Sequence, residues 1–71
     1  MKVFIYQDYR CVYTQHSVAV YKYDTKQKEY VFNRKLHTNR ELNREKAAIS
    51  ILERSLTEEF LQNLENADAH L

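Results

Sequence analysis

Residues 29–56 read EYVFNRKLHTNRELNREKAAISILERSL, and they contain the strongest strand and helix signals in the chain. Its first part, residues 29–35, contains aromatic and β-branched side chains, which suit the pleated surface of a strand. Thr38-Asn39-Arg40-Glu41 then fits a capping box, in which the Thr38 hydroxyl caps a backbone N–H and Glu41 bonds back to the helix start. The sequence therefore predicts a strand over about residues 29–35, followed by a helix that begins near residue 39.

An apolar stripe at helical spacing continues from this start. Its members follow one another at intervals of 7, 3, 4, 4 and 4 residues: Leu42, Ile49, Leu52, Leu56, Phe60 and Leu64. Ser55-Leu56-Thr57-Glu58 is a second possible capping box, so the helix either runs unbroken to about residue 65 or breaks near residue 55 and restarts. We expect one long helix, or two short ones over about residues 39–55 and 57–66.

Two further strands precede this stretch. Residues 2–7 and 17–23 are rich in Val, Tyr, Phe and Ile, and residues 24–28 form a polar hairpin loop in which Asp24 can bond its own backbone. Residues 8–16 either extend the first strand or make a wide turn. The sequence thus predicts one α+β domain over residues 1–71: a three-stranded antiparallel meander with the helical segment or segments packed on one face.

Both faces of the predicted sheet carry apolar side chains. One helix cannot cover both sides of a sheet, and monomers rarely leave large apolar patches open to water. We therefore expect a tyrosine-rich interaction face, used by a second copy of the chain or by another protein, made by Phe4, Tyr6, Tyr21 and Tyr23. The alternative is that residues 57–71 fold across this second face or pack on a neighbouring molecule.

Composition excludes several classes of function. The 71 residues include neither glycine nor proline, which excludes a phosphate-binding glycine loop, a dinucleotide fingerprint and a glycine-flanked nucleophile elbow. The single cysteine, Cys11, excludes a disulfide scaffold, and its spacing from His16, His37 and His70 matches no zinc pattern. We expect no resident metal and no cofactor.

Hydropathy argues against a membrane protein. No apolar run approaches the roughly 18 residues that a membrane-spanning helix needs. Met1-Lys2-Val3 does not open like a signal peptide, so we expect a cytoplasmic chain without a membrane partner. The abundance of Tyr, Asn, Gln and charged residues suits a phage or mobile-element accessory protein.

Residues 2–11, KVFIYQDYRC, resemble the first strand of the ribonuclease H-like fold, in which an apolar strand ends in an acidic motif. Residues 30–36, YVFNRKL, followed by residues 41–49, ELNREKAAI, are similar to the retroelement branch of that fold. The resemblance covers about residues 2–56, the N-terminal half of the fold. It implies that Asp8 and Glu45 match two carboxylates that bind paired Mg²⁺ ions in active members. The later strands and the third carboxylate have no counterpart in this chain.

A second likeness involves nucleic acids. Residues 9–12, the hairpin over residues 20–32 and residues 36–42 resemble the sheet-type DNA-binding domains of phage integrases and of a plant transcription-factor family. Residues 1–46 carry ten Lys or Arg and five Asp or Glu. Residues 47–71 carry one Arg and five Asp or Glu. The likeness implies that cations of the sheet bind phosphates while tyrosines stack on bases. The candidate contacts are Arg10, Lys22, Lys26, Lys28, Arg34 and Lys35.

The function that we expect is a small non-enzymatic interaction module that binds a protein partner, or itself as a homodimer, through the tyrosine-rich face of its sheet. A nucleic-acid-binding module that uses the basic sheet and hairpin is the first alternative. A remnant ribonuclease H-like nuclease half-domain with Asp8 and Glu45 is the second, and it alone requires Mg²⁺.

Overall fold

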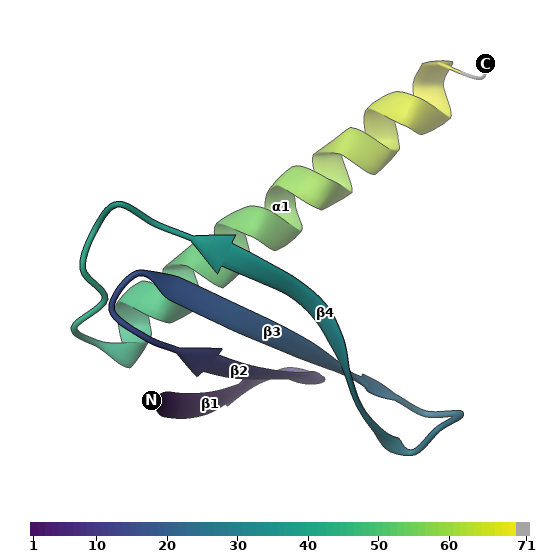
Figure 1. Cartoon of the computed structure of the whole chain (residues 1–71). Helices are drawn as coiled ribbons and strands as arrows, with labels where there is room; N and C mark the ends of the chain where they lie inside the picture. The colour runs from purple at the N-terminus through teal and green to yellow at the C-terminus, as the bar shows by residue number, and fades with distance from the viewer. Residues whose placement is uncertain (70–71) are drawn as a thin grey trace.

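The computed structural model describes residues 1–69, with side chains through Ala67. Within these residues the chain forms four strands and one helix, in the order β1 (Lys2–Tyr6), β2 (Tyr9–Tyr13), β3 (Ser17–Asp24), β4 (Glu29–His37) and α1 (Glu45–Ala69). The strands are antiparallel neighbours in sequence order, and α1 lies on one face of the sheet (Figure 1). The α+β class and the antiparallel meander with its helix are confirmed.

The sheet contains one strand more than the sequence predicts. Residues 9–13 neither extend β1 nor form a wide turn, because the chain reverses at Gln7 and Asp8 and returns as β2. Tyr6 and Tyr9 are paired across this two-residue turn, in which Gln7 has a left-handed φ of 54°. The Asp8 carbonyl accepts a hydrogen bond from the Tyr23 N–H at 2.9 Å, which ties the turn to β3.

The hairpin between β3 and β4 forms where the sequence predicts it. The Asp24 carboxylate accepts hydrogen bonds from the N–H groups of Lys26 at 2.8 Å and Gln27 at 3.2 Å, so Asp24 has the predicted local role. Lys28 takes the left-handed position, with a φ of 57°. Both strands are longer than predicted, and their distal ends project beyond β1 and β2 (Figure 1).

The predicted capping box at Thr38 is wrong, because α1 begins at Glu45. The Thr38 hydroxyl instead accepts from the N–H two residues on, at 3.1 Å, and Glu41 accepts from the side-chain amide of Gln15 at 3.1 Å. Pairing with β3 continues β4 to residue 37, and residues 38–44 carry the chain from the sheet to the helix layer. Leu42 anchors this connection, with its side chain in the core and its N–H bonded to the Gln15 carbonyl at 2.7 Å.

Of the two alternatives for the helix, the unbroken one is observed. α1 passes through the second possible capping box without interruption, and Ser55 accepts a hydrogen bond from Arg34 of β4 at 3.0 Å. Arg34 also forms an ion pair with Glu59, so both groups tie α1 to the sheet. Among residues 1–69, no helix has the length and hydrophobicity needed to cross a membrane.

The core lies between α1 and the sheet face beneath it. The buried residues come from β1, β2, β3, the connection and the first half of α1: Phe4, Cys11, Tyr13, Val18, Val20, Leu42, Ala48 and Leu52. The Phe4 and Tyr13 rings pack 5.8 Å apart, centroid to centroid. Each fully buried large apolar side chain contributes about 1.5–3 kcal/mol, so this small set is the main source of stability.

The apolar stripe of α1 leaves the core as the helix proceeds. Leu52 is fully buried and Leu56 is half-buried, but Phe60 is 62% and Leu64 is 48% exposed. Steps of four residues advance about 40° more than one full turn each, so the stripe winds away from the sheet. α1 also continues past the edge formed by β4 (Figure 1). The second half of the helix therefore has no sheet beneath its apolar side chains among the residues that the structure describes.

Candidate functional site

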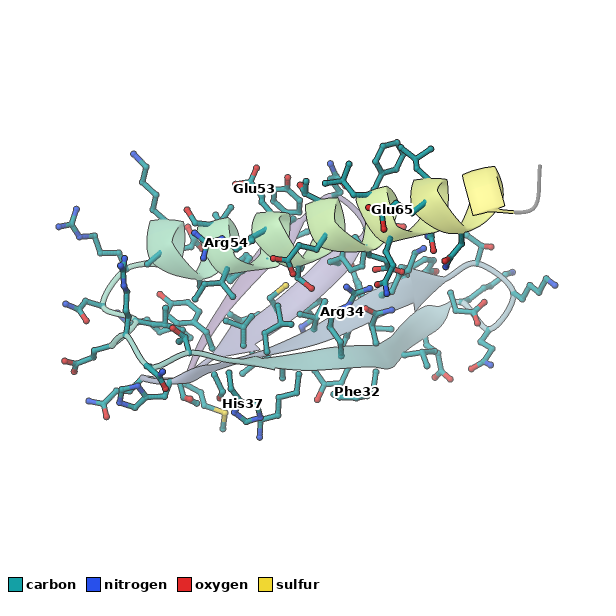
Figure 2. The ribbon with its side chains drawn as sticks, turned by 90° about the horizontal axis from the view of Figure 1, so that it is seen from above. Phe32, Arg34, His37, Glu53, Arg54 and Glu65 are labelled. Carbon is teal, nitrogen blue, oxygen red and sulfur yellow. The ribbon has the colours of Figure 1, made fainter. Side chains whose placement is uncertain are left out.

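The side of the sheet turned away from α1 is the candidate site, and we call it the outer face. Strand pairing places the following side chains on it, in rows that run across the sheet: Val3, Val12, Ala19 and Lys35; Ile5, Arg10, Tyr21 and Phe32; Tyr23 and Tyr30; and Ser17 and His37. Figure 2 shows Phe32 and His37 on this side, whereas Arg34 points toward α1. The buried residues Val18 and Val20 alternate with them and face the helix.

An apolar tract crosses the outer face from edge to edge. Ile5 of β1 is 59% exposed and Phe32 of β4 is 57% exposed, and Val12 and Tyr21 lie half-buried on the strands between them. Val3, next to this tract on β1, is 50% exposed. Contiguous exposed apolar surface of this kind marks a binding surface more often than isolated exposed residues do.

Two aromatic pairs shape the part of the outer face that lies on β3 and β4. Tyr21 and Phe32 contact each other edge to face, with ring centroids 5.7 Å apart and ring planes at 79°. Tyr23 and Tyr30 repeat the arrangement at 5.3 Å and 76°. Such pairs are favourable by roughly 0.5–1.5 kcal/mol beyond area burial. The rings are therefore held in place before any ligand arrives.

The charge on the outer face has one sign. Arg10 lies in the row of Ile5, Tyr21 and Phe32, and Lys35 lies in the row of Val3. Within residues 1–67, whose side chains the structure describes, strand pairing puts no carboxylate on this face. The surface is thus apolar with two fixed cations, and it favours a ligand that combines apolar groups with negative charge.

The structure divides the four predicted interaction residues between the two faces. Tyr21 and Tyr23 lie on the outer face as expected. Phe4 is only 5% exposed and belongs to the core, so its assignment to the interaction face is wrong. Tyr6 is also on the helix side, where its hydroxyl donates to Glu53 at 3.2 Å. Desolvation, then this hydrogen bond and the Glu53 charge, raises the pKa of Tyr6.

Pairing between β1 and β2 explains this correction and identifies the missed residues. Phe4 lies opposite Cys11, and Cys11 is fully buried, so even-numbered residues of β1 point into the core. Val3 and Ile5 consequently point outward. Val3 and Ile5 replace Phe4 and Tyr6 in the candidate site. Both faces of the sheet therefore carry apolar side chains, as the sequence predicts.

Four of the six predicted nucleic-acid contacts are accessible from the outer side or the hairpin tip. Arg10 and Lys35 lie on the outer face. Lys26 and Lys28 lie in the loop that joins β3 to β4. These four cations come from different strands and from one loop, with exposed aromatic rings between them.

The other two predicted contacts, Lys22 and Arg34, lie on the helix side of the sheet. The Nζ of Lys22 is 5.8 Å from the centroid of the Tyr9 ring, a cation–π contact on that side. Arg34 is engaged by Ser55 and Glu59 of α1. The structure therefore does not gather the six predicted contacts into one surface.

The two carboxylates implied by the ribonuclease H-like resemblance lie far apart. Asp8 is in the turn between β1 and β2. Glu45 starts α1 after a connection that is hydrogen-bonded, through Leu42, to Gln15 at the opposite end of β2. Both side chains are exposed. Two carboxylates at opposite ends of a strand do not hold one pair of metal ions, which must lie roughly 4 Å apart.

The remaining reactive side chains are dispersed. Burial raises the pKa of Cys11 to about 11, so its thiol stays protonated near neutral pH. Within residues 1–69, no three His, Cys, Asp or Glu side chains come together in a way that could hold a metal ion. His70 lies outside the described residues.

Comparison with known proteins provides no relative for this chain. Neither a protein-family model, nor a curated protein, nor a solved structure matches it. The ribonuclease H-like relationship stays a prediction from the sequence. The functional interpretation consequently depends on the geometry and chemistry of the outer face.

Proposed function

We propose that this chain is a non-enzymatic protein-interaction module, that the outer face is its binding surface, and that a second copy of the chain is its first partner. One observation carries the proposal: an apolar tract crosses all four strands on the side of the sheet that α1 does not cover. A domain of this size has a small core, so apolar side chains left outside it are a loss of stability unless they are buried elsewhere. The exposure of Val3, Ile5 and Phe32 is explained if contact with another molecule buries them.

The energetics support a specific but modest interaction. Full burial of one large apolar side chain contributes about 1.5–3 kcal/mol, and association costs an estimated 4–15 kcal/mol in lost rigid-body freedom. The exposed parts of three side chains, together with the Tyr21 and Tyr23 rings, are available on each copy to offset this cost. Because the aromatic pairs already fix the rings, little side-chain entropy is lost on binding. The net gain is therefore small, and we expect an affinity in the micromolar range or weaker.

The dispersed reactive groups agree with a binding role. Asp8 and Glu45 lie at opposite ends of β2, and the Cys11 thiol is buried and protonated. None of these three residues lies on the outer face. The exposed surface with the most distinctive chemistry is therefore one that recognises another molecule by shape, apolarity and charge.

Sedimentation from about 1 to about 100 µM, the range of micromolar affinity, tests the proposal. We expect the mass to rise with concentration for the native chain. Tyr21→Glu removes the ring that packs on Phe32 and puts a carboxylate into the apolar tract opposite Arg10, so it should keep the chain monomeric. Thr25→Glu, in the exposed hairpin loop, is the matched control and should associate like the native chain. A native chain that stays monomeric throughout this range contradicts the proposal.

Binding of single-stranded nucleic acid is a second candidate, favoured by one observation. Arg10 and Lys35 share the outer face with the exposed rings of Phe32 and Tyr30, and four antiparallel strands form a platform beneath them. Stacking on such rings contributes about 1–3 kcal/mol per base. Titration with a mixed-sequence oligonucleotide at two salt concentrations tests it, since phosphate contacts weaken steeply with salt. No binding at about 50 mM salt removes this candidate.

A further inference from the structure

The second half of α1 is another uncovered apolar surface, and we call residues 57–67 the helix end. Phe60, Leu61 and Leu64 lie on one side of it and are 62%, 53% and 48% exposed. The three side chains are neighbours on the helix surface, because residues three or four apart face the same way. They lie past the position where Arg34 joins Glu59 to the sheet.

The helix end carries the charge that the outer face lacks. Residues 57–67 include three acids and neither Lys nor Arg. Glu59 pairs with Arg34, whereas Glu58 and Glu65 are exposed to solvent. They stand three residues before and four residues after Leu61, so both flank the apolar side chains. The helix end is thus apolar and acidic, whereas the outer face is apolar and basic.

The two surfaces cannot meet within one molecule. α1 lies in the layer on the inner side of the sheet (Figures 1 and 2). Its apolar stripe winds away from that sheet along the helix, as the exposure of Phe60 and Leu64 shows. The helix end is available to a second copy instead. Residues 57–67 span about 16 Å along the helix, and four strands span about 14 Å across a sheet, so one helix end matches the width of one outer face.

We propose that the chain assembles head to tail, with the helix end of one copy packed across the outer face of the next. Phe60, Leu61 and Leu64 then cover the tract around Ile5 and Phe32. Glu58 and Glu65 come near the cations of the outer face, Arg10 and Lys35. The inference rests on the proposed function and deepens it, because it names the part of the second copy that the outer face recognises.

Charge favours this arrangement over contact between two outer faces. Face-to-face pairing brings the Arg10 and Lys35 cations of two copies together, which is repulsive, and leaves both helix ends uncovered. Head-to-tail contact buries both apolar surfaces and pairs opposite charges. Such an interface is heterologous, so each copy has a donor surface and an acceptor surface that are separable by mutation.

Complementation between two variants tests the proposal in the full-length chain. Phe32→Glu removes the acceptor surface and keeps the helix end. Leu61→Lys removes the donor surface and keeps the outer face. Both replaced side chains are more than half exposed, so we expect native circular dichroism for both variants, with a lower urea midpoint for Phe32→Glu because it loses the contact with Tyr21. Each variant alone should sediment as a monomer, and an equimolar mixture should form a 1:1 complex, because one intact donor meets one intact acceptor.

Other outcomes overturn the inference in distinguishable ways. If Leu61→Lys still associates like the native chain while Phe32→Glu does not, the outer face binds itself; the proposed function stands and the head-to-tail arrangement is wrong. If Phe32→Glu associates and Leu61→Lys does not, the helix ends bind each other and both proposals fail. A monomeric native chain also removes both.

A second pair of variants protects the test against misfolding. Ile5→Glu and Leu64→Lys change other exposed side chains on the same two surfaces and should reproduce the complementation. Mixing Phe32→Glu with Ile5→Glu is the control: both lack the acceptor surface, and we expect no complex. Complex formation in this control contradicts the proposal.

Discussion

The two faces of the sheet are built from similar side chains but have opposite environments. On the inner face the side chains under α1 are almost inaccessible, at 5% exposure or less: Phe4, Cys11, Val18 and Val20. On the outer face Val3, Ile5 and Phe32 are exposed by half or more. Apolar character alone therefore does not determine which face becomes the core. The face that the helix covers becomes the core, and the other face stays exposed.

Phe4 and Phe32 allow the strongest test of this difference, since one residue type occupies both faces. Phe4→Ala removes a ring from the core and should destabilise the fold by about 3–5 kcal/mol. Phe32→Ala removes a ring that is 57% exposed but packs on Tyr21, and should cost about 1–2 kcal/mol in the monomer. Urea unfolding at a concentration below that of self-association measures both free energies.

Phe4→Ala should leave the domain with little residual stability. Small domains have total stabilities of about 5 kcal/mol or somewhat more, so this variant is expected to keep only about 0–2 kcal/mol and to unfold at a very low urea concentration. Tyr13→Phe, which keeps the ring that packs on Phe4, is the control and should remain folded. Equal losses for Phe4→Ala and Phe32→Ala contradict the distinction between the two faces.

The buried thiol of Cys11 makes the stability of the fold depend on pH. Burial raises the pKa of its thiol from an ordinary 9.0 to about 11, so the folded protein holds this proton longer than the unfolded chain. The contribution is fully present below pH 9 and is lost as pH rises toward 11. We expect the free energy of unfolding to fall by on the order of 2 kcal/mol across this window.

Cys11→Ala is the control for this titration. It lowers the free energy of unfolding near neutral pH, but it should make the decline between pH 9 and pH 11 shallower, because no thiol ionises. Tyr6, whose pKa is also raised, contributes to the slope in both proteins and cancels in the comparison. Identical slopes for the two proteins contradict the burial of an ionisable thiol beneath α1.

Much of the fold could be predicted because its signals are local. The aromatic and β-branched content of β3 and β4 indicates strands, and the Asp24 loop is built from bonds within a few residues. Helical spacing from Ile49 through Leu56 corresponds to side chains that do pack on the sheet. In each case the sequence neighbourhood is also the structural neighbourhood.

The helix start could not be predicted in this way. Residues 38–41 match a capping box, but pairing of His37 with Ser17 keeps β4 extended up to that point. Burial of Leu42 then fixes residues 38–44 as a connection. Both contacts are long-range, and they override the local preference for an earlier helix.

The composition of the candidate site depended on a turn that has no sequence signature. Tight hairpin turns usually contain Asn-Gly or Asp-Gly. Here Gln7, a residue other than glycine, adopts the left-handed conformation. Missing this turn hides β2, and with it the pairing that sends Ile5 outward and Phe4 inward. The presence of a second apolar face could be predicted from the sequence. Of the four residues assigned to it, however, only Tyr21 and Tyr23 lie there.

Gln7→Gly tests the turn that sets which face each β1 side chain occupies, because glycine adopts the left-handed conformation without steric cost. A non-glycine residue at left-handed φ is disfavoured by about 1–2 kcal/mol, and the entropy of glycine in the unfolded chain offsets part of the gain. We expect a stabilisation of up to about 1 kcal/mol, measured as a higher urea midpoint. Gln27→Gly, in the other hairpin loop, is the control and should give no gain. No stabilisation by Gln7→Gly contradicts a strained turn.

Arg34 and Lys35 are adjacent cations whose side chains lie on opposite faces of the sheet. Arg34 bonds to Ser55 and pairs with Glu59, whereas Lys35 lies in the outer row with Val12 and Ala19. Arg34→Ala should lower the free energy of unfolding by about 1 kcal/mol, and a double-mutant cycle with Glu59→Ala should give a coupling of about 0.5 kcal/mol. Lys35→Ala should leave the free energy of unfolding of the monomer unchanged and weaken only the association seen in sedimentation. If Lys35→Ala destabilises the monomer as much as Arg34→Ala does, Lys35 has a partner within its own chain and the outer face is not free for a second copy.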